Sequence, residues 1–358
     1  MSIRKAILYL LASTAACGNI SRAAAQNSSL LSRDLSVKPG DDFYRYANGG
    51  WLKTAVIPAG RPSYDSRTML VERTSQRVRD LVQGAAAAHD VAGSLTQKVR
   101  DYYASFMDED SIEARGMTPL DEEMAGITAI ADKVALSAFL GASLNSEVEG
   151  LTSNADHILG VWINQGFEDS DHNFPHLLQG GLGLPTRDDY IDSSPQAAAL
   201  RGRYQTHIAA ILKLLGIADP EGRAARVMSL EVRIAESHAP ESDAADVFKQ
   251  NNQWKRADFS VKAPGMDWEA YFRSAGLIGQ SDFVVWQPSA VTGTAALVGS
   301  ESIDVWKDYL RFHLVEHYSS VLPKAVAGED FSFYGATLAG SRERPSRSNQ
   351  PTAHWAKP

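Results

Sequence analysis

The sequence predicts a mainly α-helical protein, a multi-helix domain that also contains a small β-hairpin. Three observations favour this fold class. Apolar residues recur at three- and four-residue spacing over several segments. Helix-capping residues stand where these segments begin, and runs with strand-like composition are few and short. The helices are therefore expected to pack on one another to form the core.

Helix starts are predicted from local capping signals. Ser94 and Gln97 form a capping box. Thr118-Pro119 and Asp219-Pro220 each combine an N-cap residue with proline at the first helical position. A longer helix is expected from about Ser302 to Leu322. The apolar stripes are Leu95, Val99, Tyr102 or Tyr103 and Phe106; Leu120, Met124, Ile127 and Ile130; Tyr204, Ile208, Ile211, Leu212 and Leu215, ended by Gly216; Val227, Leu230 and Ile234; and Trp306, Leu310, His313, Leu314, His317 and Val321.

Strand signals are limited to three short segments. Residues 157–163 and 177–179 are expected to pair as a small hairpin, and residues 283–286 form a further strand. No internal repeat is visible along the chain.

Composition and charge narrow the class of protein. The 358 residues are 44% hydrophobic, an ordinary globular composition that can bury a full core. The formal net charge of −8 argues against a protein that tracks the phosphates of nucleic acid. We divide the chain into a signal peptide (1–25), a flexible leader (26–37), a main domain (38–340) and a divergent tail (341–358).

The first residues predict export to the periplasm or the extracellular space. Arg4 and Lys5 precede an apolar run, and the small residues 23–25 precede a cleavage site at Gln26. The run is too short for a permanent transmembrane segment. Cys17, the single cysteine, has two interpretations: it is a lipidation site, or it is removed with the signal peptide. Either way, no disulfide framework and no cysteine-based metal site is expected.

A series of motifs follows one another in a fixed order. The first reads Asp-Asp-Phe-Tyr and ends in Gly-Gly-Trp-Leu at residues 41–52, and the most distinctive is Gln-Gly-Gly-Leu-Gly-Leu-Pro at residues 179–185, followed by Arg-Asp-Asp-Tyr. The other motifs lie at residues 98–108, 116–120, 264–268, 306–310 and 331–340. From about residue 38 to residue 340, this order resembles the N-terminal domain of the neprilysin and endothelin-converting-enzyme family of zinc metallopeptidases.

The resemblance implies a helical lid over a catalytic domain, and between them a chamber that admits only short peptides. The zinc of that family is held by His-Glu-x-x-His and a later Glu, but no His-Glu pair occurs in this sequence. We therefore expect no catalytic residue, no metal ligand and no cofactor in this chain. The chain is expected to be inactive by itself, to meet peptide substrates only when joined to a catalytic half, and to reflect a frameshift, a premature stop or a short paralogue.

The segment that follows residues 41–52 bears on substrate capture. Residues 41–52 themselves are interpreted as an aromatic anchor for the start of the chain. In some relatives an arginine precedes the tyrosine that comes next and holds a peptide carboxylate. Here Ser63 takes that place before Tyr64, with Arg61 two residues away. The substrate-binding residues therefore stay unknown.

Two other patterns suggest alternative chemistry. Gly181-x-Gly183 could suggest a phosphate loop, but a dinucleotide fingerprint needs glycine at Thr186, so tight turns and close backbone packing are the better interpretation. His313, Glu316 and His317 form the inverted zinc motif His-x-x-Glu-His. The two histidines fall in an apolar stripe and the resembled family uses this stretch as a structural helix, so zinc binding here is the weaker alternative. A non-catalytic helical module that binds peptides or a partner is the other functional hypothesis.

Overall fold

The structure is a computed structural model that describes residues 32–56, 64–88, 91–144, 157–344 and 346–347. The chain divides into two compact units, residues 1–80 and 81–358. The predicted signal peptide, Cys17, the first half of the leader, Arg61, Ser63 and most of the tail lie outside the described residues. The predicted boundaries at residues 25, 37 and 340 therefore stay predictions.

The first unit contains helix α2 (Phe43–Leu52) and most of helix α3 (Ser66–Ala87), which continues into the second unit. Asp42 caps α2 by accepting a hydrogen bond of 2.9 Å from the backbone N–H of Arg45. Phe43 and Tyr44, from the segment that we interpret as an aromatic anchor, are 69% and 63% exposed. Only Gly49 of this helix is buried.

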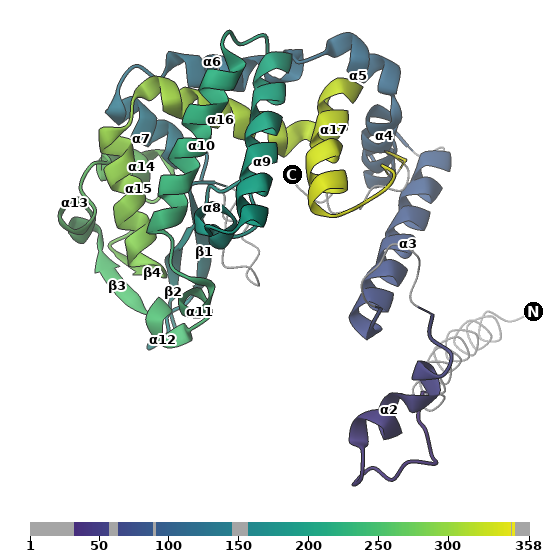
Figure 1. The fold of residues 1–358 in the computed structure, drawn as a ribbon. Helices are drawn as coiled ribbons and strands as arrows, with labels where there is room; N and C mark the ends of the chain where they lie inside the picture. The colour runs from purple at the N-terminus through teal and green to yellow at the C-terminus, as the bar shows by residue number, and fades with distance from the viewer. Residues whose placement is uncertain (1–31, 57–63, 89–90, 145–156, 345, 348–358) are drawn as a thin grey trace, which may run out of the picture. The chain divides into compact units, whose positions relative to one another are not determined.

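Helices dominate the second unit (Figure 1). They are α4 (Leu95–Met107), α5 (Glu109–Arg115), α6 (Asp121–Ala129), α7 (Lys133–Ala142), α8 (Arg187–Ile191), α9 (Pro195–Leu214), α10 (Pro220–Ser237), α11 (Glu241–Ala244), α12 (Val247–Gln250), α13 (Phe259–Lys262), α14 (Trp268–Ser274), α15 (Pro288–Ser300), α16 (Ile303–Tyr318) and α17 (Lys324–Asp330). Short 3-10 turns cover Thr118–Leu120, Arg256–Asp258 and Ser319–Val321, and a π-helical segment, Phe331–Leu338, follows α17. The predicted mainly α-helical class is confirmed.

A four-stranded mixed sheet accompanies these helices. Its strands β1 (Leu159–Gln165), β2 (Asn173–Gln179), β3 (Asn252–Lys255) and β4 (Asp282–Val285) lie in the order β1-β2-β4-β3. The predicted hairpin is β1 and β2, paired antiparallel, while β4 runs parallel to β2 and antiparallel to β3. Sequence reasoning missed β3 because it is a polar edge strand in which only Trp254 is buried.

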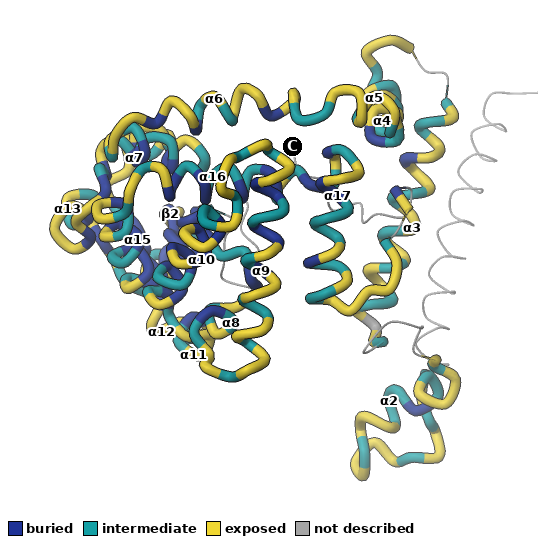
Figure 2. Tube along the Cα trace, turned by 45° about the horizontal axis from the view of Figure 1, so that its top comes forward, coloured by how far each residue is buried: buried dark blue, intermediate teal, exposed yellow. Residues whose placement is uncertain are grey.

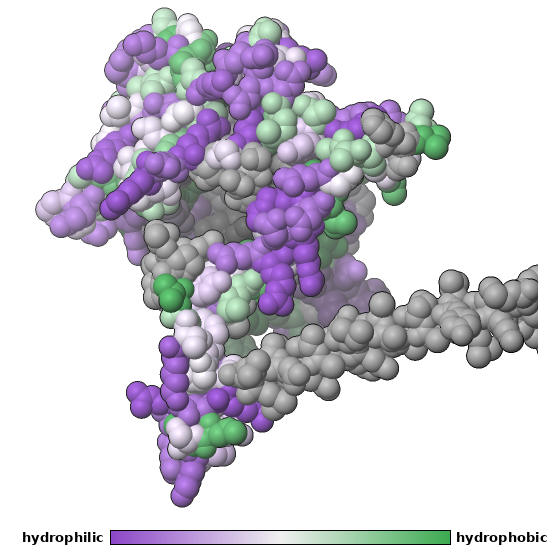
Figure 3. All heavy atoms as spheres, turned by 90° about the vertical axis from the view of Figure 1, so that its right-hand side faces the viewer, coloured by the Kyte–Doolittle hydropathy of each residue, from purple (hydrophilic) through white to green (hydrophobic). Residues whose placement is uncertain are grey.

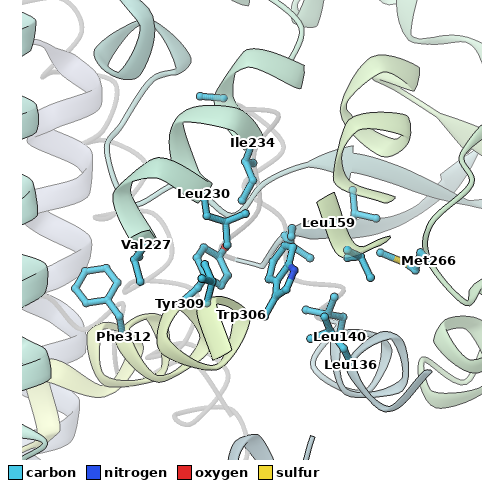
Figure 4. Close-up of a cluster of buried hydrophobic side chains, with 14 of the residues drawn as sticks. Leu136, Leu140, Leu159, Val227, Leu230, Ile234, Met266, Trp306, Tyr309 and Phe312 are labelled. Carbon is cyan, nitrogen blue, oxygen red and sulfur yellow. The ribbon is translucent and has the colours of Figure 1, made fainter. Parts of the chain in front are cut away.

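The core lies where α9, α10 and α16 pack on one another, and the same apolar cluster continues through α7, α14, α15 and the sheet. Figure 4 shows side chains of α10 facing side chains of α16, and Leu136 and Leu140 of α7 beside them. Buried segments (dark blue in Figure 2) concentrate on the inward sides of these helices. The facing side chains are Val227, Leu230 and Ile234 from α10 and Trp306, Tyr309 and Phe312 from α16.

Three details of the predicted helices need correction. Helix α16 ends at Tyr318, and its buried face is Val305, Trp306, Tyr309, Phe312 and Val315, so the predicted apolar stripe through His317 and Val321 is wrong. Thr118 does not cap a helix: its hydroxyl donates to the Arg115 carbonyl, and α6 begins at Asp121. Helix α4 does begin after Ser94, whose hydroxyl accepts from Gln97 N–H, but it buries only Phe106 of its predicted stripe.

The surface is mainly polar on the face that Figure 3 shows, where hydrophilic residues (purple) outnumber the hydrophobic ones (green). Some large apolar side chains are nevertheless exposed, such as Leu70, Leu81 and Phe248 at 62%, 73% and 94%. Within the part of the chain that the structure describes, no helix combines the length and the apolar character needed to span a bilayer.

Candidate functional site

The glycine-rich motif forms the loop from the end of β2 to α8, here called the glycine loop (residues 179–186). Gly181 has a positive φ of 80°, and a Cβ there would lie 2.8 Å from the Cα of Ile158 and 2.6 Å from the Tyr309 hydroxyl. A Cβ on Gly183 would collide with the Tyr204 hydroxyl. The two glycines therefore allow a tight turn and close packing, as predicted.

Glu231 of α10 lies beneath this loop and is completely buried. Its carboxylate accepts from the hydroxyl of Tyr190 at 2.5 Å, and from the hydroxyl of Tyr204 at 3.1 and 3.0 Å to its two oxygens. It also accepts from the backbone N–H of Gly183 at 3.3 Å, and it lies 3.0 Å from Nε2 of His313. A carboxylate is stable in a protein interior only when donors surround it, and this set of donors meets that condition.

Tyr190 and a further tyrosine, Tyr309, bind the backbone of the glycine loop. The Tyr190 hydroxyl accepts from Leu184 N–H at 2.7 Å while it donates to Glu231. The Tyr309 hydroxyl donates to the Gly181 carbonyl at 2.8 Å. Burial, followed by the charge of Glu231, raises the pKa of Tyr190 far above its usual range, so its hydroxyl stays protonated and can donate.

The start of the glycine loop is fixed from α10 as well. Nε2 of His238 lies 3.1 Å from the Gly180 carbonyl oxygen and must donate to it, because a carbonyl oxygen only accepts. Burial lowers the pKa of His238 to about 4, so the ring is neutral at physiological pH. The Gln179 side chain accepts from Ala239 N–H at 2.8 Å. We call Glu231 together with Tyr190, Tyr204, His313 and the N–H of Gly183 the Glu231 cluster.

A second group of charges, the His207 cluster, joins α9, α16 and α17; His207 is buried and its acidic partners are partly buried. Nδ1 of His207 lies 3.0 Å from Glu329, and its Nε2 lies 3.2 Å from Glu316, although the second contact is poorly aligned for a hydrogen bond. The His207 ring stacks on Phe333 with 5.0 Å between ring centroids. Burial alone would lower the pKa of His207, but the two carboxylates outweigh it and raise the pKa to about 9.

Asp330 adds a third carboxylate to the His207 cluster. Burial, together with the nearby charge of Glu316, raises the pKa of Asp330 to about 6. The cluster thus sets the His207 imidazolium against three acidic groups, and Arg344 acts on Asp330 through its charge. Such an excess of acid in a partly buried place makes the cluster sensitive to pH.

The three residues of the predicted His-x-x-Glu-His motif point to different partners. His313 belongs to the Glu231 cluster, Glu316 belongs to the His207 cluster, and His317 is exposed with its ring against Tyr318. No group of three or more His, Cys, Asp or Glu side chains in the described ranges is placed to hold a metal ion. These donors do not fit a zinc ion in their present positions. Metal binding by His313, Glu316 and His317 remains a hypothesis for metal analysis.

Sequence reasoning missed the centres of both clusters, although each left a signal. Glu231 lies four residues after Val227 and three before Ile234, which puts a carboxylate on the buried face of a helix. His207 lies between Tyr204 and Ile211 at the same kind of spacing. A polar residue inside a predicted apolar stripe therefore indicates a buried polar contact.

Comparisons with known proteins agree with this architecture. Residues 39–354 match the family profile of the N-terminal part of peptidase family M13. Human endothelin-converting enzyme 1 is 25% identical over 338 residues, which cover 91% of this chain and 43% of that enzyme. The locust (Locusta migratoria) endothelin-converting enzyme homolog is 26% identical over 273 residues, 74% of this chain and 37% of that protein.

Solved structures give the same result. The zinc metalloprotease Zmp1 of Mycobacterium tuberculosis, determined with an inhibitor, superposes with a TM-score of 0.74 at 30% identity and covers 88% of this chain. PepO from Lactobacillus rhamnosis shares the fold, with a TM-score of 0.61 at 16% identity.

The chain spans less than half the length of these relatives, 48% in the case of Zmp1. Since the family profile matches almost the whole main domain, the chain belongs to peptidase family M13, the neprilysin family of zinc metallopeptidases, and represents its N-terminal region.

Proposed function

We propose that residues 38–340 serve as the helical lid of a neprilysin-like zinc metallopeptidase that cleaves short peptides. The match to the N-terminal part of family M13 over residues 39–354 supports this role. So does the likeness to Zmp1, a zinc metalloprotease of which this chain covers 48%. In this proposal the zinc ion and the residues that activate water belong to a catalytic domain outside the present sequence. The lid restricts access to them.

The observation that carries the proposal is that the residues of the His-x-x-Glu-His motif contact different partners. His313 serves the carboxylate of Glu231, while Glu316 faces His207, so the only such motif of the sequence is engaged in two separate clusters. A hydrolytic zinc site needs its ligands to converge on one point and to leave a position open for water. We therefore propose that this chain by itself hydrolyses no peptide, and that peptide substrates require the catalytic half.

Peptide hydrolysis by the purified chain tests the catalytic part of the proposal. Quenched fluorescent peptides of about ten residues are incubated with the chain and zinc, with and without 1,10-phenanthroline. We expect no cleavage that the chelator suppresses. Cleavage that disappears with the chelator and in a His317→Ala variant would contradict the proposal and favour a free-standing inverted-motif enzyme.

A chimera tests the role as a lid. Residues 38–340 replace the matching region of Zmp1, and the chimera is compared with the isolated catalytic half of Zmp1 at equal zinc content. We expect the chimera to cleave short peptides and to exclude folded proteins. A chimera that binds zinc but shows the same peptide and protein cleavage as the catalytic half alone would contradict a lid function.

Exposed apolar side chains favour a second candidate, a non-catalytic module that binds a peptide or a protein partner. Leu70 and Val71 of α3 are 62% and 57% exposed, and exposed apolar surface commonly marks an interaction site. Calorimetry with short peptides, combined with the measured molar mass in solution, decides this candidate. A monomer that binds no peptide counts against it.

We also propose that the protein is exported, with residues 1–25 as the signal. The basic residues Arg4 and Lys5 before an apolar run support this proposal, and lipidation of Cys17 is its variant. Expression in a bacterial host followed by fractionation and mass spectrometry checks both. A chain that keeps its first 25 residues and stays in the cytoplasm would overturn the proposal.

A further inference from the structure

A pocket separate from both clusters opens between the start of α6, the end of α9 and the charged face of α10 and α16. Its volume is about 450 Å³. This volume lies within the range usual for small-molecule sites. The pocket is lined by Met117, Asp121, Met124, Leu214, Leu215, Ile217, Ala218, Arg223 and Arg311.

One side of the pocket is apolar. It combines two flexible methionines, Met117 and Met124, with three aliphatic side chains from the end of α9 and the turn after it. Leu214 is 41% exposed, so water currently covers apolar surface that a ligand could cover instead. Methionines adapt to irregular apolar ligands because their side chains are unbranched and polarizable.

The other side carries two arginines that share one carboxylate. Asp308 is 1% exposed, and Nη1 of Arg223 lies 2.8 and 3.0 Å from its two oxygens. Nη1 of Arg311 lies 3.5 Å from the same carboxylate. Two guanidinium groups against one buried carboxylate leave one positive charge in excess at this wall of the pocket.

The arginine donors are only partly used. Nε of Arg223 donates to the Ala218 carbonyl at 2.9 Å, but its Nη2 has no hydrogen-bond partner among the described residues. The Arg223 and Arg311 side chains are 31% and 20% exposed. Arg223 is held by Asp308 and the Ala218 carbonyl, and Arg311 by Asp308 and by its Nη2, which donates to the Thr128 hydroxyl at 3.1 Å. A ligand would therefore meet donors that are already oriented.

Asp121 limits the charge that the pocket accepts. It is an exposed acidic residue in the first turn of α6, and it lines the same pocket. With Asp121 counted, two arginines face two carboxylates and the pocket is neutral as a whole, so a dianion such as phosphate is disfavoured and a monoanion that meets the arginine donors is the better match. A carboxylate with an apolar chain therefore matches the lining best.

We propose that this pocket binds a small monocarboxylate with a short branched apolar chain. The carboxylate pairs with Arg223 and Arg311, and the chain lies on Met117, Met124 and Leu215. Two sources offer this chemistry: a free carboxylic acid, and the carboxylate of an apolar amino acid. The site lies away from the Glu231 and His207 clusters and is independent of the proposed lid function.

Titration calorimetry on the purified full chain tests the site with 4-methylpentanoate, 4-methylpentanamide and leucine as probes. We expect saturable one-to-one binding of 4-methylpentanoate and at least tenfold weaker binding of the amide, since the amide has the same shape without the charge. Leucine that binds more tightly than 4-methylpentanoate points to amino acids as the source, and weaker binding points to free acids; both results support the site.

Two variants separate the pocket from nonspecific binding. Arg311→Gln removes one charge, and Met124→Trp fills the pocket while it keeps both arginines. Each is expected to weaken 4-methylpentanoate binding at least tenfold, while Arg203→Gln, an exposed arginine of α9 outside the pocket lining, leaves it unchanged. Far-UV circular dichroism checks that each variant is folded. Absence of saturable binding, equal binding of the amide, or unchanged binding in Met124→Trp would overturn the proposal.

Discussion

The Glu231 cluster and the His207 cluster both include a residue of α16, but their carboxylates are stabilised in different ways. Glu231 is surrounded by hydrogen-bond donors, among them the hydroxyls of Tyr190 and Tyr204. The His207 cluster places one imidazolium among three acidic groups. We infer from this difference that the Glu231 cluster fixes the geometry of the glycine loop. The contribution of the His207 cluster to stability, in contrast, depends on pH.

Removal of the Glu231 carboxylate is expected to have the largest effect. In Glu231→Ala, two tyrosine hydroxyls and Nε2 of His313 lose their buried partner at once. The free energy of unfolding should fall by about 3–5 kcal/mol, measured by urea denaturation at pH 7. Glu236→Ala, an exposed change on the same helix, should cost no more than about 0.5 kcal/mol. If the two variants are equally stable, the Glu231 cluster does not organise the core.

The His207 cluster should make stability fall at alkaline pH. The folded pKa of His207, about 9, lies above its usual value of 6.5, so its stabilising contribution is complete below pH 6.5 and is lost as the pH rises through 9. The difference amounts to at most about 3 kcal/mol. Urea denaturation between pH 6 and pH 10 should show this loss in the wild type and a flatter profile in His207→Gln. Identical profiles would show that the ion pairs do not matter.

The close packing of the glycine loop can be tested by adding a single methyl group to one of its glycines. Gly183→Ala places a methyl group against the Tyr204 hydroxyl and should lower the stability by about 1–3 kcal/mol. Gly202→Ala is its matched control, because a Cβ at this helical position meets nothing within 4 Å. This control should stabilise the protein by about 0.5–1 kcal/mol. Similar melting temperatures for both variants would refute the packing role of Gly183.

Substitution of Asp330 should change the stability least, and it tests whether the His207 cluster contains an excess of acidic groups. Its folded pKa, about 6, exceeds its usual value of 3.8, so its stabilising contribution is complete below pH 3.8 and is lost as the pH rises through 6. Asp330→Asn removes this partly buried negative charge and should raise the stability at pH 7.5 by about 1–2 kcal/mol, as measured by urea denaturation. A variant less stable than the wild type at pH 7.5 would contradict an excess of acid.

Much of the fold was predictable because it depends on local signals. The Asp219 cap and the stripe Val227, Leu230 and Ile234 predict α10 correctly, since caps and apolar spacing act within one helix. Strand β3 was not predictable in this way, because its edge position depends on pairing with β4, far along the chain. The same holds for the clusters: His313 and Glu231 are 82 residues apart in sequence.

The His-x-x-Glu-His pattern shows the limit most clearly. Helical spacing predicts that His313 and His317 share one side of α16, but spacing alone does not say which helices pack against that side. In the structure, α10 presents Glu231 to His313, α9 presents His207 to Glu316, and His317 stays exposed. Tertiary neighbours thus decide the role of each residue.

The zinc content of the purified chain tests the central claim most directly. The protein is dialysed against buffer with 10 µM zinc, passed through a desalting column and analysed by plasma mass spectrometry. If His313 and Glu316 serve two separate clusters as described, zinc should remain far below one equivalent and should not change in His317→Ala. One tightly held zinc per chain that is lost in His317→Ala would contradict the account.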